Sequence, residues 1–168
     1  PSAGTGLLAI LAEITGGAVS GVIRGHYDKK DQGFVTADYN ATEGSRDYGL
    51  SGEIDVTDRT RLTFGHTDWS DDSGDARKDS QIGFEQDLGQ AFLLEAALGR
   101  TSRTVPLGLP RENGSRTDIG LRLTWTRDED LSVYAFGQAT LSTTGALREN
   151  NRLGLGVEAR LSDRLTFE

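Results

Sequence analysis

Residues 56–65 read VTDRTRLTFG and residues 160–168 read RLSDRLTFE, so nearly the same phrase occurs twice in the chain. In both copies an Asp-Arg pair interrupts an alternating run, and Leu-Thr-Phe follows directly. Alternation of apolar and polar residues is typical of a half-buried β-strand, and a short polar stretch between two such runs is typical of a turn. The phrase therefore predicts two equivalent turns, each joining two antiparallel strands.

The same unit recurs between the two copies. Short polar turns are predicted near residues 57–60, 87–90, 127–130 and 162–164. Period-two apolar residues flank each of them, among them Leu50, Ile54, Leu62, Phe64, Ile82, Phe84, Leu94, Leu98, Leu121, Leu123, Val133, Ala135, Leu155 and Val157. A repeating order of strand, short turn, strand and longer loop predicts an all-β, antiparallel up-and-down meander.

The connections of this meander alternate in length. The longer ones are residues 68–80, 101–117 and 142–151. All short turns then lie at one end of the sheet and all long loops at the other, which is typical of transmembrane β-barrels. For residues 18–168 we predict a transmembrane β-barrel of about eight to ten strands, or part of one.

The two faces of the predicted sheet differ in composition. One face carries Leu, Ile, Val, Ala and Phe, and the other carries Gly, Ser and Thr with embedded charges. These charges suit either an ion path or cross-strand pairs that fill a narrow barrel, and we favour the pairs. The charged residues that we expect to face a lumen are Glu53, Asp55, Glu85, Glu95, Arg122, Glu158 and Arg160.

Composition excludes several classes of function. The net charge of −8 and the scattered Lys and Arg residues argue against a nucleic-acid partner. The absence of cysteine excludes a disulfide scaffold and a thiolate metal site. No apolar run reaches the roughly 20 residues of a membrane helix. The most apolar stretch, residues 6–14, lacks two-residue alternation, so we favour a short helix over a strand within the N-terminal segment 1–17. Residues 18–28 and 33–40 are expected to form a further hairpin.

Two small constellations are candidates for chemistry. His66, Asp68 and Ser70 alternate, so they share one side of a strand, but positions i and i+2 lie roughly 6–7 Å apart, which is long for a nucleophile and its base. Asp68, Asp71, Asp72 and Asp75 offer carboxylates of the kind that Ca²⁺ prefers, but without the EF-hand order. We favour a solvated acidic loop, no cofactor and a non-enzymatic function, and keep a barrel hydrolase centred on His66 as an alternative.

The hairpins at residues 116–142 and 151–168, RTDIGLRLTWTRDEDLSVYAFGQATLS and NRLGLGVEARLSDRLTFE, carry a family resemblance. They resemble the barrel regions of large outer-membrane proteins from Gram-negative, alphaproteobacterial species. The resemblance implies a bacterial outer-membrane location, membrane lipid as a partner, and a role as a porin-like pore, a membrane anchor or a translocator of a larger surface protein. The main alternative is a soluble or surface-exposed β-domain that acts as an adhesin or binding module.

The last predicted strand is short. Residues 165–168 follow the final turn, whereas the earlier return strands have about nine or ten residues, the length of a tilted membrane crossing. We therefore expect the barrel to be incomplete at its C-terminus. The last strand needs a partner, which is a further segment of the same polypeptide, as we favour, a second chain, or an early strand near residues 18–27 that closes a small barrel.

Limited proteolysis tests the assignment of the two ends. We expect the first cleavage within residues 101–117, because Pro106 and Pro110 cannot donate to a β-ladder and the Gly and Asn residues around them favour turns. Mass spectrometry of the earliest fragments gives the site. A first cut at residues 127–130 would contradict the assignment.

Overall fold

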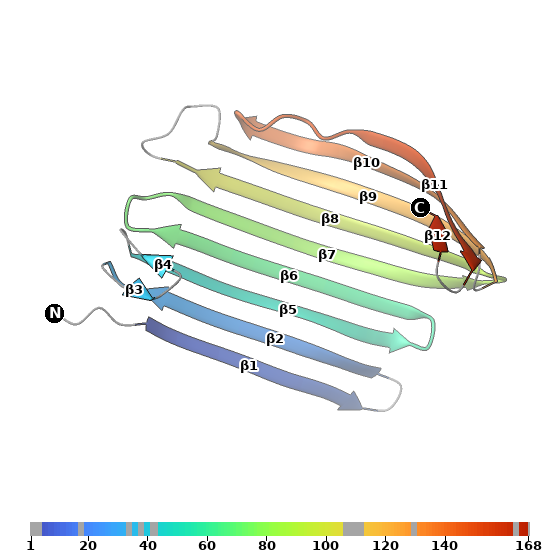
Figure 1. Ribbon diagram of the computed structural model, residues 1–168, viewed down its shortest axis with the longest axis horizontal. Helices are drawn as coiled ribbons and strands as arrows, with labels where there is room; N and C mark the ends of the chain where they lie inside the picture. The colour runs from blue at the N-terminus through green and yellow to red at the C-terminus, as the bar shows by residue number, and fades with distance from the viewer. Residues whose placement is uncertain are drawn as a thin grey trace.

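The computed structural model describes residues 5–16, 19–32, 35–36, 39–40, 44–105, 113–128, 131–162 and 165–167. These residues form one ten-stranded antiparallel sheet and one small separate hairpin, with no helix among them. The large sheet has the order β1-β2-β5-β6-β7-β8-β9-β10-β11-β12, which is an up-and-down meander (Figure 1). The strands are β1 (Thr5–Gly16), β2 (Val19–Lys30), β3 (Val35–Thr36), β4 (Tyr39–Asn40), β5 (Ser45–Thr57), β6 (Thr60–Asp71), β7 (Ala76–Gly89), β8 (Phe92–Thr104), β9 (Gly114–Asp128), β10 (Leu131–Gly145), β11 (Arg152–Ser162) and β12 (Leu165–Phe167).

Short and long connections alternate along the meander, which confirms the predicted topology. The short turns gather at one end of the sheet, on the right in Figure 1, and the longer connections between β2 and β5, β8 and β9, and β10 and β11 lie at the other end. The pairs that close the short turns are Gly16 with Val19, Thr57 with Thr60, Gly89 with Phe92, Asp128 with Leu131, and Ser162 with Leu165.

The predicted N-terminal helix is wrong. Residues 6–14 belong to β1, which pairs with β2 along its whole length, from Thr5 with Lys30 to Gly16 with Val19. The local sequence has apolar residues at both parities, so the ladder with β2, rather than amphipathicity, determines the strand. The predicted hairpin of residues 18–28 with 33–40 is also wrong: β2 pairs with β1 and β5, while β3 and β4 pair with each other.

Several connections are shorter than the sequence suggests. Strands β6 and β7 continue through most of residues 68–80, so the acidic connection between them shrinks to residues 72–75. Strands β8 and β9 likewise extend to Thr104 and from Gly114, and β10 extends to Gly145. Ladder pairing uses backbone groups, so it continues beyond the point where apolar side chains end.

The sheet is a single layer with two different faces, and it is not closed. Strands β1 and β12 are its two edges, so a barrel is not established. No large side chain in the described part of the chain is fully buried. What the sheet lacks, within those residues, is a second layer that would cover it.

Two aromatic rings stabilise the pairing of β10 with β11 by lying across glycines. Phe136 pairs with Gly154 and Tyr134 pairs with Gly156. A Cβ atom at either glycine would collide with the facing ring. The glycines therefore leave room for an aromatic ring to pack flat on the backbone of the neighbouring strand, as in the aromatic rescue of glycine in designed sheets.

The β7–β8 turn offers a test of backbone strain. Gln90 and Ala91 have φ angles of 51° and 70°, a left-handed region that costs a residue with a Cβ roughly 1 kcal/mol or more. We expect Ala91→Gly to stabilise the fold by roughly 0.5–1 kcal/mol, measured by denaturant unfolding. Ala97→Gly, in the middle of β8, is the matched control and should destabilise by a similar amount. A destabilising Ala91→Gly would contradict the turn geometry.

Candidate functional site

The register of the ladder assigns the positions of the charged residues to faces of the sheet. Because Cα partners in an antiparallel ladder point to the same side, following the partners from strand to strand assigns each position to a face. The positions of Glu53, Asp55, Glu85, Glu95, Arg122, Glu158 and Arg160 all fall on one face, here called the charged face. The other side of the sheet, which carries Leu121 and Leu155, is called the apolar face.

A row of charges crosses the charged face near the short-turn end. Asp55, Arg61, Glu85, Glu95 and Arg122 are successive register partners from β5 to β9, and this set with Glu158 is called the charged row. Arg61 Nε donates a 2.7 Å hydrogen bond to Asp55 Oδ1. Arg122 lies 3.5 Å from Glu95 and 3.6 Å from Glu158.

The charged row keeps an excess of negative charge. Glu85 and Glu95 face each other directly across β7 and β8, an arrangement that is unfavourable for like charges. Each of these two glutamates is also a register partner of one arginine, Arg61 for Glu85 and Arg122 for Glu95, which offsets the repulsion. The guanidinium of Arg122 is held from a third direction, 4.0 Å from the centre of the Tyr134 ring.

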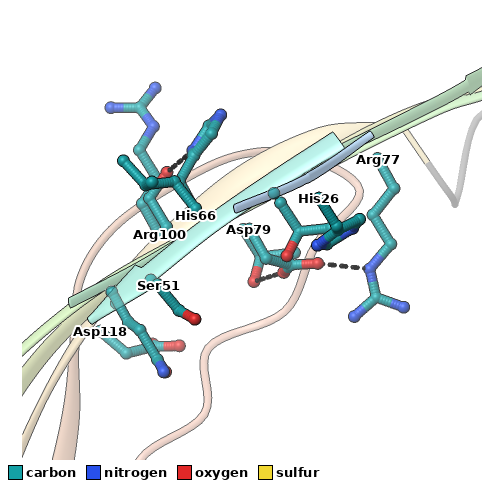
Figure 2. Close-up of a pocket in the computed structure, with 15 residues that line it drawn as sticks. His26, Ser51, His66, Arg77, Asp79, Arg100 and Asp118 are labelled. Atoms are coloured by element: carbon teal, nitrogen blue, oxygen red, sulfur yellow. Dashed lines mark hydrogen bonds and ion pairs between the residues drawn. The ribbon is translucent and has the colours of Figure 1, made fainter. Parts of the chain in front are cut away.

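A hollow of ≈ 510 Å³ lies nearer the long-loop end, where glycines replace side chains. Gly49, Gly65 and Gly99 contribute to its lining, and His26, Ser51, Asp79 and Asp118 project from the charged face beside them (Figure 2). The side chains of His66 and Arg100 lie on the opposite side of the sheet (Figure 2).

The two aspartates at this hollow are held by hydrogen bonds. Asp79 accepts from Arg77 Nε at 2.6 Å and from Thr101 Oγ1 at 2.7 Å. Asp118 accepts from Arg116 Nε at 2.7 Å and from Thr140 Oγ1 at 2.6 Å. Both carboxylates are thus compensated by an arginine two residues away on the same strand. Their ion pairs therefore lie within one strand, and only the threonine hydrogen bonds cross to the neighbouring strand.

The opposite face carries a continuous band of exposed apolar side chains. Leu155 is 82% exposed and Ile10 is 59% exposed, and a contiguous exposed apolar surface of this kind marks an interaction site. The apolar band comprises Leu8, Ile10, Ile14, Ile23, Leu50, Ile54, Leu62, Phe64, Ile82, Phe84, Leu94, Leu98, Ile119, Leu121, Leu123, Val133, Leu153, Leu155 and Val157.

Aromatic pairs border this band at both ends. Phe92 pairs with Trp125 at the short-turn end, and Tyr27 pairs with Tyr48 at the long-loop end. Amphipathic rings at both edges of an apolar band are typical of the two interfaces of a membrane.

Residues that are register partners from strand to strand form rows across the sheet, and the apolar band runs obliquely to these rows. On β1 and β2 it begins at Leu8 and Tyr27, whereas on β11 it begins at Leu153, roughly two to three rows nearer the short-turn end. At about 3.3 Å per residue this is a drift of roughly 13–20 Å across about 38 Å of sheet. The strands are therefore tilted by roughly 20–30° from the perpendicular of the band, which is below the about 35–45° typical of membrane barrels.

The residues of the predicted hydrolase alternative do not assemble as a triad. His66 Nδ1 lies 2.8 Å from the hydroxyl of Ser80 on β7, rather than near Ser70 on its own strand. Asp68 accepts a 2.7 Å hydrogen bond from the Tyr48 hydroxyl and forms an ion pair with Lys78 Nζ. A base and a hydroxyl are therefore in contact, but the expected carboxylate is engaged elsewhere. The contact between His66 and Ser80 results from the register of β6 with β7, so the spacing of residues along one strand did not predict it.

The four aspartates of the predicted acidic loop have separate roles. Asp68 lies on β6, and Asp75 lies 3.7 Å from Arg103. Asp71 closes the β6–β7 turn, where the Ser73 hydroxyl and backbone N–H groups donate to its carboxyl and lower its pKa. Asp72 is exposed. Among the described residues, no group of His, Cys, Asp or Glu side chains is arranged to hold a metal ion.

Arg122 offers a test of the charged row. We expect Arg122→Gln to lower the free energy of unfolding by roughly 0.5–1 kcal/mol, because Glu95 and Glu158 lose their counterion while remaining partly exposed. Arg148→Gln, in the connection between β10 and β11, is the control and should change the unfolding free energy little. The loss should shrink when Glu85→Gln is added, since one repulsive partner of Glu95 is then removed. If the changes in unfolding free energy of Arg122→Gln and Glu85→Gln simply add in the double variant, the charges of the row are not coupled and the interpretation is contradicted.

No protein-family model and no curated protein matches the sequence. No helix in the described part of the chain is long and apolar enough to span a membrane.

Proposed function

We propose that this chain forms the wall of a transmembrane β-barrel in a bacterial outer membrane and that it serves as a pore, a membrane anchor or a translocator of a larger surface protein. The observation that carries the proposal is the apolar band, which crosses the strands of a single-layered sheet and is covered by nothing within the described residues. Lipid acyl chains are a natural cover for such a band.

The charged face supports the same proposal from the other side. Its charges are partly or fully exposed and of both signs, and several are paired across strands, as suits a water-filled interior. The hollows over glycines leave room for water beside those pairs. The charged row has more carboxylates than guanidiniums, so an open path along this face would favour cations over anions.

The open edges set a condition on the proposal. In hydrocarbon, each unsatisfied backbone group costs several kcal/mol, so β1 and β12 both need partners. We propose that further strands supply them, either from the same polypeptide or from a second chain.

The soluble alternative requires a different cover for the apolar face. A surface-exposed β-domain needs a second layer over the apolar face, because exposed Leu and Ile side chains at this density cause association in water. Such a domain stays in solution without detergent, whereas the proposed barrel wall requires detergent for extraction.

A pair of adjacent substitutions tests the proposal. Leu121 lies in the apolar band of β9, and its neighbour Gly120 lies on the charged face, where an added Cβ has room, with its nearest contact at 3.9 Å. We expect Leu121→Arg to impair membrane assembly, since arginine at mid-bilayer costs roughly 2–4 kcal/mol, and Gly120→Arg to assemble normally. Gly156 is a poor site for this control because the Tyr134 ring covers it.

The measurement is the fraction of protein that is recovered in membranes and that migrates differently on a gel before and after boiling. Equal assembly of the Leu121→Arg and Gly120→Arg proteins would count against a lipid-facing band. Recovery of the wild-type protein in a detergent-free soluble fraction would favour the β-domain alternative.

A further inference from the structure

The charges on the apolar face are confined to its ends and are mostly positive. At the long-loop edge of the apolar band this face carries Lys29, Arg46, Lys78 and Arg100, here called the cationic rim. Asp68 is a carboxylate on this face beside the cationic rim, and Tyr48 and Lys78 already bind it. This segregation runs against the net charge of the whole chain, which is −8.

Two members of the cationic rim are available to an external anion. Arg46 and Arg100 are exposed, and neither forms an ion pair with a carboxylate among the described residues. Arg100 projects on the same side of the sheet as His66, away from Asp79 and Asp118 (Figure 2). Lys29 differs, because its ammonium lies 2.8 Å from Asp31.

The position of the rim indicates the depth at which it would act. Arg46 lies next to Tyr48 on the same face of β5, on the long-loop side of it. Arg100 lies next to Leu98 on the same face of β8, also on the long-loop side. Arg100 therefore lies one same-face position beyond the apolar band and Arg46 lies two positions beyond it, where long basic side chains keep their charge in the polar layer while their stems cover apolar surface. A guanidinium binds phosphate oxygens through two parallel hydrogen bonds.

We propose that the cationic rim binds the phosphate of anionic lipid headgroups in the leaflet on the long-loop side. The inference rests on the proposed membrane function, because it places the apolar band in acyl chains and the rim at headgroup depth. Electrostatic attraction to anionic lipid gives the affinity, and Arg46 and Arg100, which have no carboxylate partner in the described part of the chain, give the preference for phosphate.

A titration of the folded full chain in a zwitterionic detergent tests this proposal. The probe is a short-chain phosphatidic acid, and the apparent Kd is taken from the shift in the thermal unfolding midpoint. We expect Arg46→Gln/Arg100→Gln to weaken binding roughly 20- to 30-fold, since each basic side chain near an anionic lipid surface contributes about fivefold. Arg152→Gln, at the long-loop end of β11 but on the charged face, is the matched control and should change the Kd by less than about twofold. Arg46→Lys/Arg100→Lys keeps the charge and should bind more tightly than the glutamine variant.

Four results would overturn the inference. The first is equal affinity of the wild-type and glutamine proteins for phosphatidic acid. The second and third are a midpoint shift with inorganic phosphate, or with short-chain phosphatidylcholine of zero net charge, that equals the shift with phosphatidic acid. The fourth, which applies if the glutamine variant does not fold, is wild-type binding that is unchanged between about 50 and 500 mM NaCl. A wild-type chain that inserts into zwitterionic vesicles but does not prefer phosphatidic acid refutes this inference alone. A chain that inserts into neither kind of vesicle refutes the proposed function as well.

Discussion

The separation of the two faces depends on one constraint, the unbroken register of the antiparallel ladder. Side chains in a strand have a period of two, so a slip of one residue would move every carboxylate of the charged face into the apolar band. Four register irregularities lie at strand ends, at Asp55/Thr57, Asp87/Gly89, Leu131/Ser132 and Arg160/Ser162, and one, at Thr140/Ser142, lies inside β10. Through most of the sheet the pairing is continuous from β1 to β11, and this continuity gives one face its aliphatic surface and the other its ion pairs.

A sheet of this kind is not stabilised by a core of its own. Covering apolar surface contributes about 25 cal/mol per Å², and in the described residues the aliphatic side chains of the band are largely uncovered. Exposed ion pairs contribute at most about 1 kcal/mol each, so the charged face does not make up the difference. The stability of the fold therefore depends on what lies against the apolar face, and this dependence links the fold to the membrane proposal.

The face on which a side chain lies was predictable from the two-residue alternation along a strand. The contacts between strands were not, because they depend on the register. The side of Glu53, Glu95 or Arg122 can be read from the sequence, because parity along a strand assigns it. The contact of His66 with Ser80 cannot, since it depends on which residue of β7 faces β6. The hollow beside Asp79 and Asp118 was missed for the same reason, because Gly49, Gly65 and Gly99 come together only when the strands are aligned.

The N-terminal strand shows the limit of local pattern most clearly. Residues 6–14 place apolar side chains at both parities, and Leu11 lies 63% exposed on the charged face. Nothing in that stretch alone distinguishes a helix from a strand, and the long pairing with β2 decides the outcome.

The order of strands also has a consequence for how the sheet forms. Apart from the excursion through β3 and β4, each strand pairs with its immediate neighbour in the chain, so the contact order is low for a sheet of this width. Each new strand closes only a small loop, and doubling a loop's length adds only about 0.6 kcal/mol of closure entropy. Assembly can therefore proceed as a zipper, hairpin by hairpin, with each completed ladder serving as the template for the next.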